Sequence, residues 1–576
     1  MQQKALSGTY FRMVTILCGV LSLVMLVSSC AISRPVRQGT PPKVAVLTYH
    51  NDTFRTGQNR QEAILNTKNV TPATFGKLVS YPVDGEIYAQ PLVVPDVRLP
   101  DGSVHDIVYV ATESDSVYAF DANAVHAGAP LWHASFVNAD YHVIPVPSPE
   151  LYPPVTGYDI FPYVGITGTP VIDRASGTLY VVTMTEESGR YVERLHALDI
   201  ATGKEKPSGP VDIKARVTLS GPSGQRTVTF NVQDANQRPA LLLSHGVIYI
   251  AWASFGDYGS YHGWVMGYDA TTLKQVFAYA DTPDGNGGGI WMGGDGPAAD
   301  ESGNVYVISG NGPFNLDQNG SDASNTILRF SPGKGSKVTD YFTPFNQFCL
   351  NDGDVDLGSG GPLLLPDQSG AHQHELVAMG KEGRLYLVDR DHMGQYQSIS
   401  DPCSQSERMD VDAVVQEFQP QASTNGGTFF GTPTYWQGTK TSGPLIYIGA
   451  FHYPLKAYRL VNGELATSPS SSAHTKLEFP GATASVSSNG SMDGTGIVWV
   501  VTASSCDRTG CNPQGEGILR AYDATNLSKE LYNSEMRPAR DRLESYVKFS
   551  VPTVANGKVF VGTGYSLAIY GLLAGS

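Results

Sequence analysis

The sequence predicts an all-β fold, an eight-bladed β-propeller built from four-stranded antiparallel blades. An apolar strand recurs eight times along the chain, and a short segment ending in proline precedes seven of the copies. The composition agrees, because 62 glycines and 37 prolines beside 30 tyrosines and 21 phenylalanines suit short strands and tight turns. It does not suit a helical bundle.

The recurring strand is apolar on both faces and carries a large residue at its centre. Such runs are typical of strands packed between layers. Successive centres lie 52 to 71 residues apart, which is the spacing of propeller blades. The eight central residues are Tyr109, Tyr180, Tyr249, Tyr306, Val377, Tyr447, Trp499 and Phe560.

The segment that ends in proline predicts the innermost strand of each blade. Proline cannot donate a backbone hydrogen bond, so it is confined to strand ends and to edges such as one lining a central channel. The seventh repeat has residues 485–488 in place of this segment, and a seven-bladed ring is the alternative if that repeat is an insertion. The seven segments end at Pro91, Pro170, Pro239, Pro297, Pro362, Pro433 and Pro552.

A third element ends in aspartate at the close of the next strand, as at Asp121, Asp199, Asp269 and Asp523. Such a carboxylate accepts backbone N–H bonds two residues on, so we interpret it as a turn former and not as a catalyst.

The pattern Ala-Leu-Asp-x-x-Thr-Gly at 197–203 resembles the repeat of pyrroloquinoline-quinone (PQQ)-type propellers. That family includes quinoprotein dehydrogenases and the propeller lipoprotein of the outer-membrane barrel-assembly machinery. The resemblance covers roughly residues 76–571 and implies the fold more than any activity.

Ring closure is predicted from the two ends of the repeat array. The final repeat stops at 567–571 without a fourth strand, whereas an unassigned strand at 77–82 precedes the first repeat. We expect this N-terminal strand to complete the last blade and so remove two open edges. The predicted domains are therefore a signal peptide (1–29), a lipidated linker and lead-in (30–75) and the propeller (76–576).

The first thirty residues are typical of a bacterial export signal. Lys4 and Arg12 precede a fourteen-residue apolar run at 14–27, which is too short to span a bilayer comfortably. The run ends in Val-Ser-Ser-Cys30, which resembles a lipobox and implies cleavage before Cys30 and acylation of its sulfur; an ordinary signal peptide is the alternative. Ala31 in place of Asp implies, by the same resemblance, an outer-membrane lipoprotein that faces the periplasm or the exterior.

Charge and cysteine content restrict the partners and the compartment. A net charge of −15 excludes a nucleic-acid backbone as the partner. We expect a protein or glycan partner at one rim of a monomeric propeller. Contact with the membrane is expected through the lipid alone. In an oxidising compartment disulfides are expected. Cys506 and Cys511 close a short loop, which leaves Cys349 to pair with Cys403; zinc is disfavoured because no Cys-x-x-Cys motif is present.

Three segments are candidates for a binding site. The first, at 287–296, contains Trp291 and Asp295, and its glycines let the backbone approach a ligand closely. Trp291 could stack on a flat ring, as a Trp does in quinoprotein dehydrogenases. The alternative is a tight loop with Trp291 packed between blades. The second resembles the start of a calcium loop, although Leu357 and Leu363 depart from the pattern and turn-capping acids are the alternative. Its candidate metal ligands are Asp352, Asp354 and Asp356.

The third candidate, at 252–264, is an aromatic insertion that could bind a sugar, a peptide or a protein at one rim. Its candidate residues are Trp252, Tyr261, His262 and Trp264. A lone His262 is more often hydrogen-bonded within its loop than catalytic. His50, in the polar stretch 49–57, is interpreted similarly and marks a docked lead-in segment.

The sequence favours binding over catalysis. It contains no Gly-x-Ser-x-Gly elbow, no His-Glu-x-x-His and no vicinal cysteine pair. The first hypothesis is a lipid-anchored, non-catalytic binding or scaffolding module that needs no cofactor. The alternative is a PQQ- and Ca²⁺-dependent dehydrogenase of an alcohol or sugar, with both groups at the axis near Trp291, Asp295 and Asp354. A glycan-degrading enzyme with paired carboxylates is a third.

Overall fold

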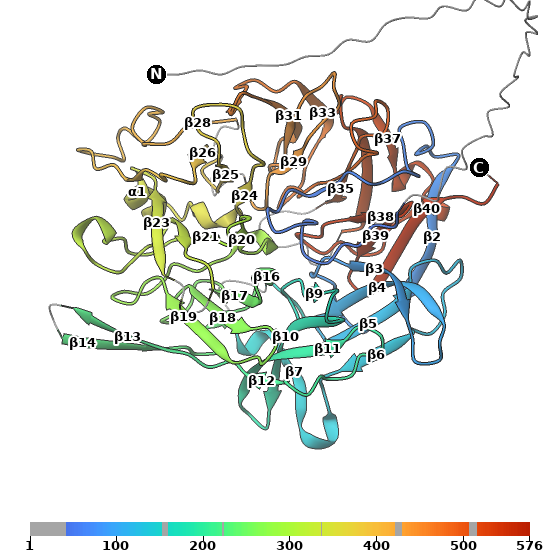
Figure 1. Ribbon diagram of the computed structural model, residues 1–576, viewed down its shortest axis with the longest axis horizontal. Coiled ribbons are helices and arrows are strands. Elements are labelled where there is room, and N and C mark those ends of the chain that lie inside the picture. Colours follow the sequence, from blue (N-terminus) through green and yellow to red (C-terminus); the bar gives the residue numbers. More distant parts are fainter. Residues whose placement is uncertain are drawn as a thin grey trace, which may run out of the picture. The chain divides into compact units, whose positions relative to one another are not determined.

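Eight antiparallel sheets follow one another in chain order as the blades of a propeller (Figure 1). This computed structural model describes residues 42–575 except 153–158, 222–223, 334, 336, 421–428 and 506–514. The predicted all-β, eight-bladed fold is confirmed, and the degenerate seventh repeat forms a complete blade. Residues from Pro42 onward belong to one compact unit, so the lead-in from there on is part of the propeller.

The first four blades each contain a short innermost strand followed by three strands further from the axis. Blade 1 is β3 (Leu92–Arg98), β4 (Val104–Thr112), β5 (Ser116–Asp121) and β6 (Trp132–Ser135), and blade 2 is β9 (Val171–Asp173), β10 (Thr178–Glu187), β11 (Tyr191–Asp199) and β12 (Val211–Asp212), extended by β7 (Val143–Pro147) and β8 (Tyr163–Val164). Blade 3 is β16 (Leu242–Ser244), β17 (Val247–Ser254), β18 (Trp264–Asp269) and β19 (Gln275–Ala280), with β15 (Ala235–Asn236) on β17, and blade 4 is β20 (Ala298–Ala299), β21 (Val305–Ile308), β22 (Ile327–Phe330), β23 (Val338–Thr343) and β27 (Gln395–Tyr396).

The last four blades repeat this order. Blade 5 is β24 (Leu363–Leu364), β25 (Glu375–Met379), β26 (Leu385–Asp389) and β28 (Gln416–Phe418), and blade 6 is β29 (Thr434–Trp436), β30 (Leu445–Ile448), β31 (Pro454–Val461) and β33 (Ser471–Lys476), with β32 (Glu464–Leu465) on β31. Blade 7 is β34 (Ser485–Ser487), β35 (Ile497–Ala503), β36 (Gly517–Asp523) and β37 (Glu530–Asn533), and blade 8 is β38 (Thr553–Ala555), β39 (Lys558–Gly562), β40 (Ser566–Leu572) and β2 (Phe75–Pro82).

The remaining elements are short. They are strand β1 (Gln58–Asn59), the hairpin β13 (Arg216–Gly221) and β14 (Gly224–Thr229), the helices α1 (Gln347–Asp352) and α2 (Pro538–Asp541), and the 3₁₀ turns η1 (Ala139–Tyr141), η2 (Ser148–Glu150), η3 (Met292–Gly294), η4 (Leu316–Gln318), η5 (Leu357–Ser359) and η6 (Ser534–Met536). None of the helices in the described part of the chain is long and apolar enough to cross a membrane.

The N-terminal strand closes the ring as predicted. Strand β2 pairs antiparallel with β40, and the register joins Phe75 to Leu572 and Pro82 to Ser566. The first and last parts of the propeller are therefore hydrogen-bonded in one sheet, and in Figure 1 β2 lies beside β40. This pairing covers edges that a linear array of blades would leave open.

Two of the repeated sequence elements work together at the blade interfaces. The central tyrosine of one blade donates its hydroxyl to the backbone carbonyl of the residue that follows the turn aspartate in the next blade. These aspartates accept backbone N–H bonds inside their own turns, which confirms them as turn formers. The interblade bonds are Tyr109 to Ile200 (3.0 Å), Tyr180 to Ala270 (2.8 Å) and Tyr447 to Ala524 (2.7 Å).

The lead-in segment 46–59, here called the inner ring, runs around the axis against the innermost strands. In five blades the second residue after the repeated proline donates its backbone N–H to an inner-ring carbonyl. The inner ring thus satisfies donors that the free strand edges would otherwise leave unpaired. The five bonds are Val93 to Val46, Ile172 to Leu47, Ala299 to Thr53, Leu364 to Phe54 and Tyr435 to Thr56.

The inner ring then reaches the last two blades, because Val486 donates to Gly57 and the Asn59 amide donates to the carbonyl of Val554 at 2.9 Å. His50 is fully buried, and its ring nitrogens lie 2.7 Å from the Arg55 carbonyl and 2.8 Å from the Ala484 carbonyl. The docked lead-in that the sequence predicts around His50 is therefore confirmed.

Arg55 is the central side chain of the inner ring and has no exposed surface. It donates to the carbonyls of Pro297 in blade 4 (2.8 Å) and Leu241 in blade 3 (3.3 Å). Its Nε also lies 3.7 Å from Oδ1 of the equally buried Asp295. Burial raises the pKa of Asp295 to about 7, and the Arg55 charge opposes that rise.

Replacing Arg55 with methionine should lower the free energy of unfolding by about 3–5 kcal/mol, since it leaves a buried carboxyl group and three backbone carbonyls without their donor. Urea unfolding followed by circular dichroism measures the change. Arg60→Met is the matched control, because Arg60 is exposed on the same segment and its loss should cost less than about 0.5 kcal/mol. Equal midpoints for the two variants would contradict the role assigned to Arg55.

Candidate functional site

A pocket of about 180 Å³ lies at one end of the propeller axis. Seven of the eight blades contribute to its wall, through the loops that lead into the innermost strands and through two loops between later strands. Only the axis is within reach of so many blades at once. The lining residues are Asp159, Asn236, Arg238, Asp257, Trp291, Gly293, Asp356, Ser359, Lys381, Phe430, Phe479, Lys548 and Phe549.

Most of these residues share one position in the repeat. They precede the repeated proline by one to six residues, so they stand at the mouth of the channel where the innermost strand begins. The proline segment is a signal from which this wall could have been found, but the sequence analysis singled out only Trp291 and Asp356 among the residues on it. The residues in this position are Asn236, Arg238, Trp291, Gly293, Asp356, Ser359, Phe430, Lys548 and Phe549.

Arg238 is the most informative residue of the pocket. Its side chain is 6% exposed and lies between two aromatic rings, with Cζ 4.6 Å from the centre of Phe549 and 5.1 Å from that of Tyr88. Within the described residues its guanidinium makes neither a hydrogen bond nor an ion pair. A buried cation with free donors that lines a pocket indicates an anionic ligand.

Lys381 and Asp356 form the second charged group of the wall. Lys381 Nζ lies 2.5 Å from Asp356 Oδ2 and 3.0 Å from Asp354 Oδ1. Burial lowers the pKa of Lys381, but the two carboxylates outweigh it and hold that pKa above its ordinary value. Asp356 also accepts the Asn311 backbone N–H at 2.8 Å. Lys381 therefore stays charged, with its charge already shared by two acids.

The other acids of the pocket are also partnered. Asp159 pairs with Lys548, and the Lys548 charge lowers the pKa of Asp159. Asp257 accepts the Tyr261 hydroxyl at 2.7 Å, while burial, followed by the Asp356 charge, raises the pKa of Asp257. Of the three cations that line the pocket, Arg238 is thus the one without a carboxylate among the described residues.

Trp291 and Asp295, predicted together, are separated by the structure. Trp291 is half-buried and lines the pocket. It is held by glycines, because a Cβ at Gly289 would lie 2.8 Å from its Nε1 and one at Gly310 would lie 3.3 Å from its Cδ1. Asp295 is fully buried beside Arg55 of the inner ring and does not line the pocket.

The aromatic rim loop is a correction to the sequence analysis. Trp252 and Trp264 are strand residues of blade 3, are 0% and 2% exposed, and pack against Phe230. Tyr261 is 7% exposed and His262 lies 3.0 Å from the carbonyl of Thr282, as a structural histidine would. These side chains do not form a rim surface, because blade packing takes up both indole rings.

The three aspartates proposed as a calcium loop do not come together. Asp352 is exposed at the end of α1, whereas Asp354 and Asp356 face the Lys381 ammonium. Among the described residues no group of three or more His, Cys, Asp or Glu side chains is placed to hold a metal ion. The lysine occupies the position where a cation would neutralise these carboxylates.

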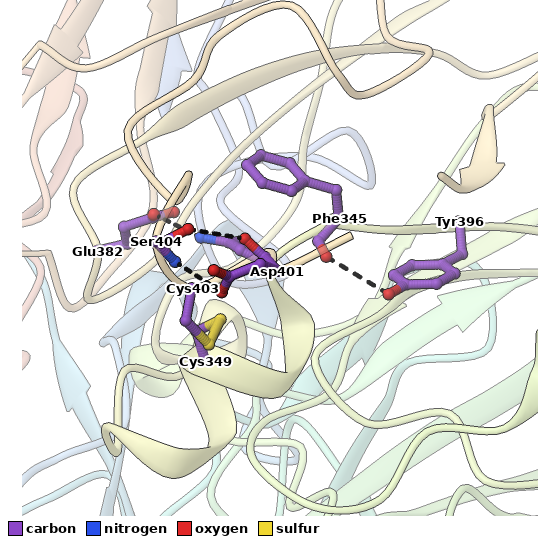
Figure 2. Close-up of a disulfide and its surroundings, with 8 residues drawn as sticks. Phe345, Cys349, Glu382, Tyr396, Asp401, Cys403 and Ser404 are labelled. Atoms are coloured by element: carbon purple, nitrogen blue, oxygen red, sulfur yellow. Dashed lines mark hydrogen bonds between the residues drawn. A yellow bond between two sulfur atoms is a disulfide. The ribbon is translucent and has the colours of Figure 1, made fainter. Parts of the chain in front are cut away.

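One disulfide lies beside this part of the wall. Cys349 on α1 and Cys403 are bonded at an S–S distance of 2.09 Å, as predicted (Figure 2). The helix leads directly to Asp354 and Asp356, so the bond ties the start of this segment to the 400s loop. The predicted Cys506–Cys511 bond, the lipidated Cys30 and the signal peptide lie outside the described residues.

Comparison with known proteins supports the fold. No protein-family model and no curated protein matches the sequence. The quinohemoprotein alcohol dehydrogenase from Comamonas testosteroni has a similar structure, with a TM-score of 0.59 at 17% identity over 92% of this chain and 81% of that one. A quinohemoprotein alcohol dehydrogenase from Pseudomonas putida HK5 is also similar, with a TM-score of 0.54 at 14% identity over 92% of this chain and 80% of that one. For a europium-containing methanol dehydrogenase the TM-score is 0.51 at 15% identity, over 92% of this chain and 98% of that one. The chain thus has the eight-bladed fold of quinoprotein dehydrogenases.

Removing the disulfide with the pair Cys349→Ser and Cys403→Ser should lower the free energy of unfolding by up to about 4 kcal/mol. The bond joins residues 54 apart, and a loop of that length restricts the unfolded chain by about this amount. Thermal and urea unfolding measure the loss, with Ser400→Ala on the same loop as the control. A double variant as stable as the control would show that the bond does not stabilise the fold.

Proposed function

We propose that the axial pocket binds a planar aromatic carboxylate, and that a quinone of the PQQ type is the ligand class that its residues fit. The single observation that carries the proposal is the buried Arg238 guanidinium, which lines the pocket without an acidic partner among the described residues. A ligand carboxylate would supply the charge and the acceptors that this group lacks.

The rest of the wall suits a flat ring. Trp291, Phe430, Phe479 and Phe549 bring aromatic faces and edges to the pocket. Between them stand polar groups that can fix orientation, among them Asn236, whose Oδ1 is buried without a hydrogen-bond partner among the described residues. A few polar groups in a largely apolar wall are typical of a small-molecule site.

The charges of the pocket restrict how such a ligand binds. Lys381 and Lys548 are shared with Asp356 and Asp159, so a carboxylate that reaches either lysine competes with an existing ion pair. A carboxylate at Arg238 breaks no existing ion pair among the described residues, although the Arg238 charge also lowers the pKa of Asp159 and opposes the burial that raises the pKa of Glu113. We therefore place the tightest anionic contact at Arg238 and weaker ones at the two lysines.

The shared fold supports a quinone as the first ligand to test, because the similar structures are dehydrogenases whose names include a quinone cofactor. Calcium is not part of the proposal, since the described acids form no metal site and Lys381 already neutralises two of them. The absence of a vicinal cysteine pair also sets this chain apart from many quinoprotein alcohol dehydrogenases.

Oxidation of an alcohol or sugar is a second candidate function, and the Asp356–Lys381 pair favours it. A bound quinone would supply the acceptor for the hydride that leaves the substrate carbon, so that the alcohol carbon becomes a carbonyl and the quinone is reduced. Asp356 lines the pocket beside the Lys381 ammonium, where its carboxyl group can take a proton from a substrate hydroxyl. Binding without turnover, by a lipid-anchored module, is the function that the sequence alone favours, and the assay below separates the two.

Arg238→Gln should weaken PQQ binding about 10- to 100-fold, because a hydrogen bond to a charged group contributes about 1.5–3 kcal/mol. Calorimetry with purified protein measures the affinity, and Trp291 fluorescence reports contact with the quinone. The control is Arg98→Gln, which removes an exposed arginine from blade 1.

Equal affinities for the two variants, or no binding to the unaltered protein, would refute the proposal. Dye reduction with a panel of alcohols and aldoses then decides between the two functions. Turnover that is lost in Asp356→Asn, with PQQ binding retained, would support an oxidoreductase. Binding without turnover on any substrate would support a binding module.

A further inference from the structure

A second cavity, of about 510 Å³, lies on blade 2 between β11 and the segment that carries the hairpin β13–β14. We call it the blade-2 groove. Tyr191, Glu193 and Arg194 of β11 line one side, and Phe230 after the hairpin lines the other. It is larger than the axial pocket and has a different wall, so it is a separate place for a ligand.

Glu193 is the unusual residue of the blade-2 groove. Its side chain is 1% exposed. One carboxyl oxygen, Oε2, accepts the indole N–H of Trp252 at 2.8 Å, whereas Oε1 has no hydrogen-bond partner among the described residues. A buried oxygen left without a donor costs about 1–3 kcal/mol. Since Glu193 lines the groove, a ligand there that reaches Oε1 would supply the missing donor.

Apart from the exposed Arg190, the other charges of the groove are paired with one another. Arg194 pairs with both Glu187 and Asp212, and Lys214 pairs with Asp212. Arg190 is exposed at the edge of the groove. Two other titratable groups, Asp115 and Tyr268, are affected by the charge of Glu193. Burial is the main cause that raises the pKa of each, the Glu193 charge adds to it, and both effects favour the neutral form. Glu193 is therefore the acid of this wall that is free to accept a new charge.

The base of the groove is apolar and rigid. Phe230 meets Trp252 and Trp264 edge-on, with ring centres 5.2 Å and 5.6 Å away. Both indole rings are buried within blade 3, which fixes the Trp252 N–H that orients the carboxyl group. The two tryptophans that do not form a rim surface thus have a role here, since they hold Glu193 in place.

We propose that the blade-2 groove binds a small ligand through a primary ammonium group, which pairs with the carboxylate of Glu193 while an alkyl chain rests against Phe230. An ammonium group carries three N–H donors and a positive charge, so it satisfies Oε1 and matches the one acid without an ion pair on this wall. A hydroxyl group could supply a donor but no charge.

The pH dependence of binding follows from the same carboxyl group. Burial raises the pKa of Glu193 to about 8, so the group holds its proton at pH 6 and pH 7. An ammonium ligand selects the ionised form, and each binding event then releases one proton. The affinity should rise about tenfold from pH 6 to pH 7 and level off above pH 8.

The test compares butylamine with butan-1-ol, which has the same chain but no charge. Calorimetry on the purified full chain and Trp252 emission are the two readouts. Butylamine should bind the unaltered protein, with a tenfold gain from pH 6 to pH 7, and butan-1-ol should not. Glu193→Gln keeps an acceptor for Trp252 and removes the charge, so it should abolish binding, whereas the exposed Glu478→Gln should leave it unchanged.

The proposal is overturned if butan-1-ol binds as well as butylamine, if Glu193→Gln binds butylamine normally, or if the affinity does not change with pH. The pH series needs no variant and stays decisive where Glu193→Gln does not fold. None of these outcomes depends on a quinone, so the result is independent of the function proposed for the axial pocket.

Discussion

The propeller depends on how it satisfies the free edges of its innermost strands. Within its own blade each of these strands is paired on its outer side only, so its backbone N–H groups that face the axis need acceptors from outside the blade. The inner ring provides them, because five of its carbonyls accept the backbone N–H groups that lie two residues after the repeated proline in five blades. Arg55 meets the complementary need in blades 3 and 4, because its guanidinium donates to backbone carbonyls there. A polar segment is thus retained at the axis because backbone groups there cannot be left unpaired.

This constraint divides each repeat at its proline. Residues after the proline pair with the inner ring and serve stability, whereas many of the residues that line the axial pocket lie before it. In blade 4 both roles occur before the proline, because Gly293 lines the pocket whereas Asp295 is buried against Arg55. The positions before the proline therefore contribute both to the pocket and to the contact with Arg55.

Much of the architecture can be predicted from the sequence because its causes are local. Apolar runs, turn aspartates and strand-ending prolines predict eight blades, and the unmatched strands at the two ends predict closure by β2. The site is harder, because Arg238 and Lys381 acquire meaning only from partners distant in the chain. Trp252 and Trp291 both lie in stretches rich in glycine and aromatic residues, yet one packs inside blade 3 and the other lines the pocket. Composition does not separate them, but distance from the proline does.

The two cavities can be understood by one rule about buried charge. A charged group taken out of water is costly unless it is paired, and most such groups here have partners: Arg55 with Asp295, Lys381 with Asp356, Arg384 with Glu417. Arg238 lacks an acidic partner and Glu193 lacks a donor for one oxygen among the described residues, and each lines a cavity. Since their signs are opposite, the ligands that would complete them differ. An anion suits the axial pocket and a cation suits the blade-2 groove.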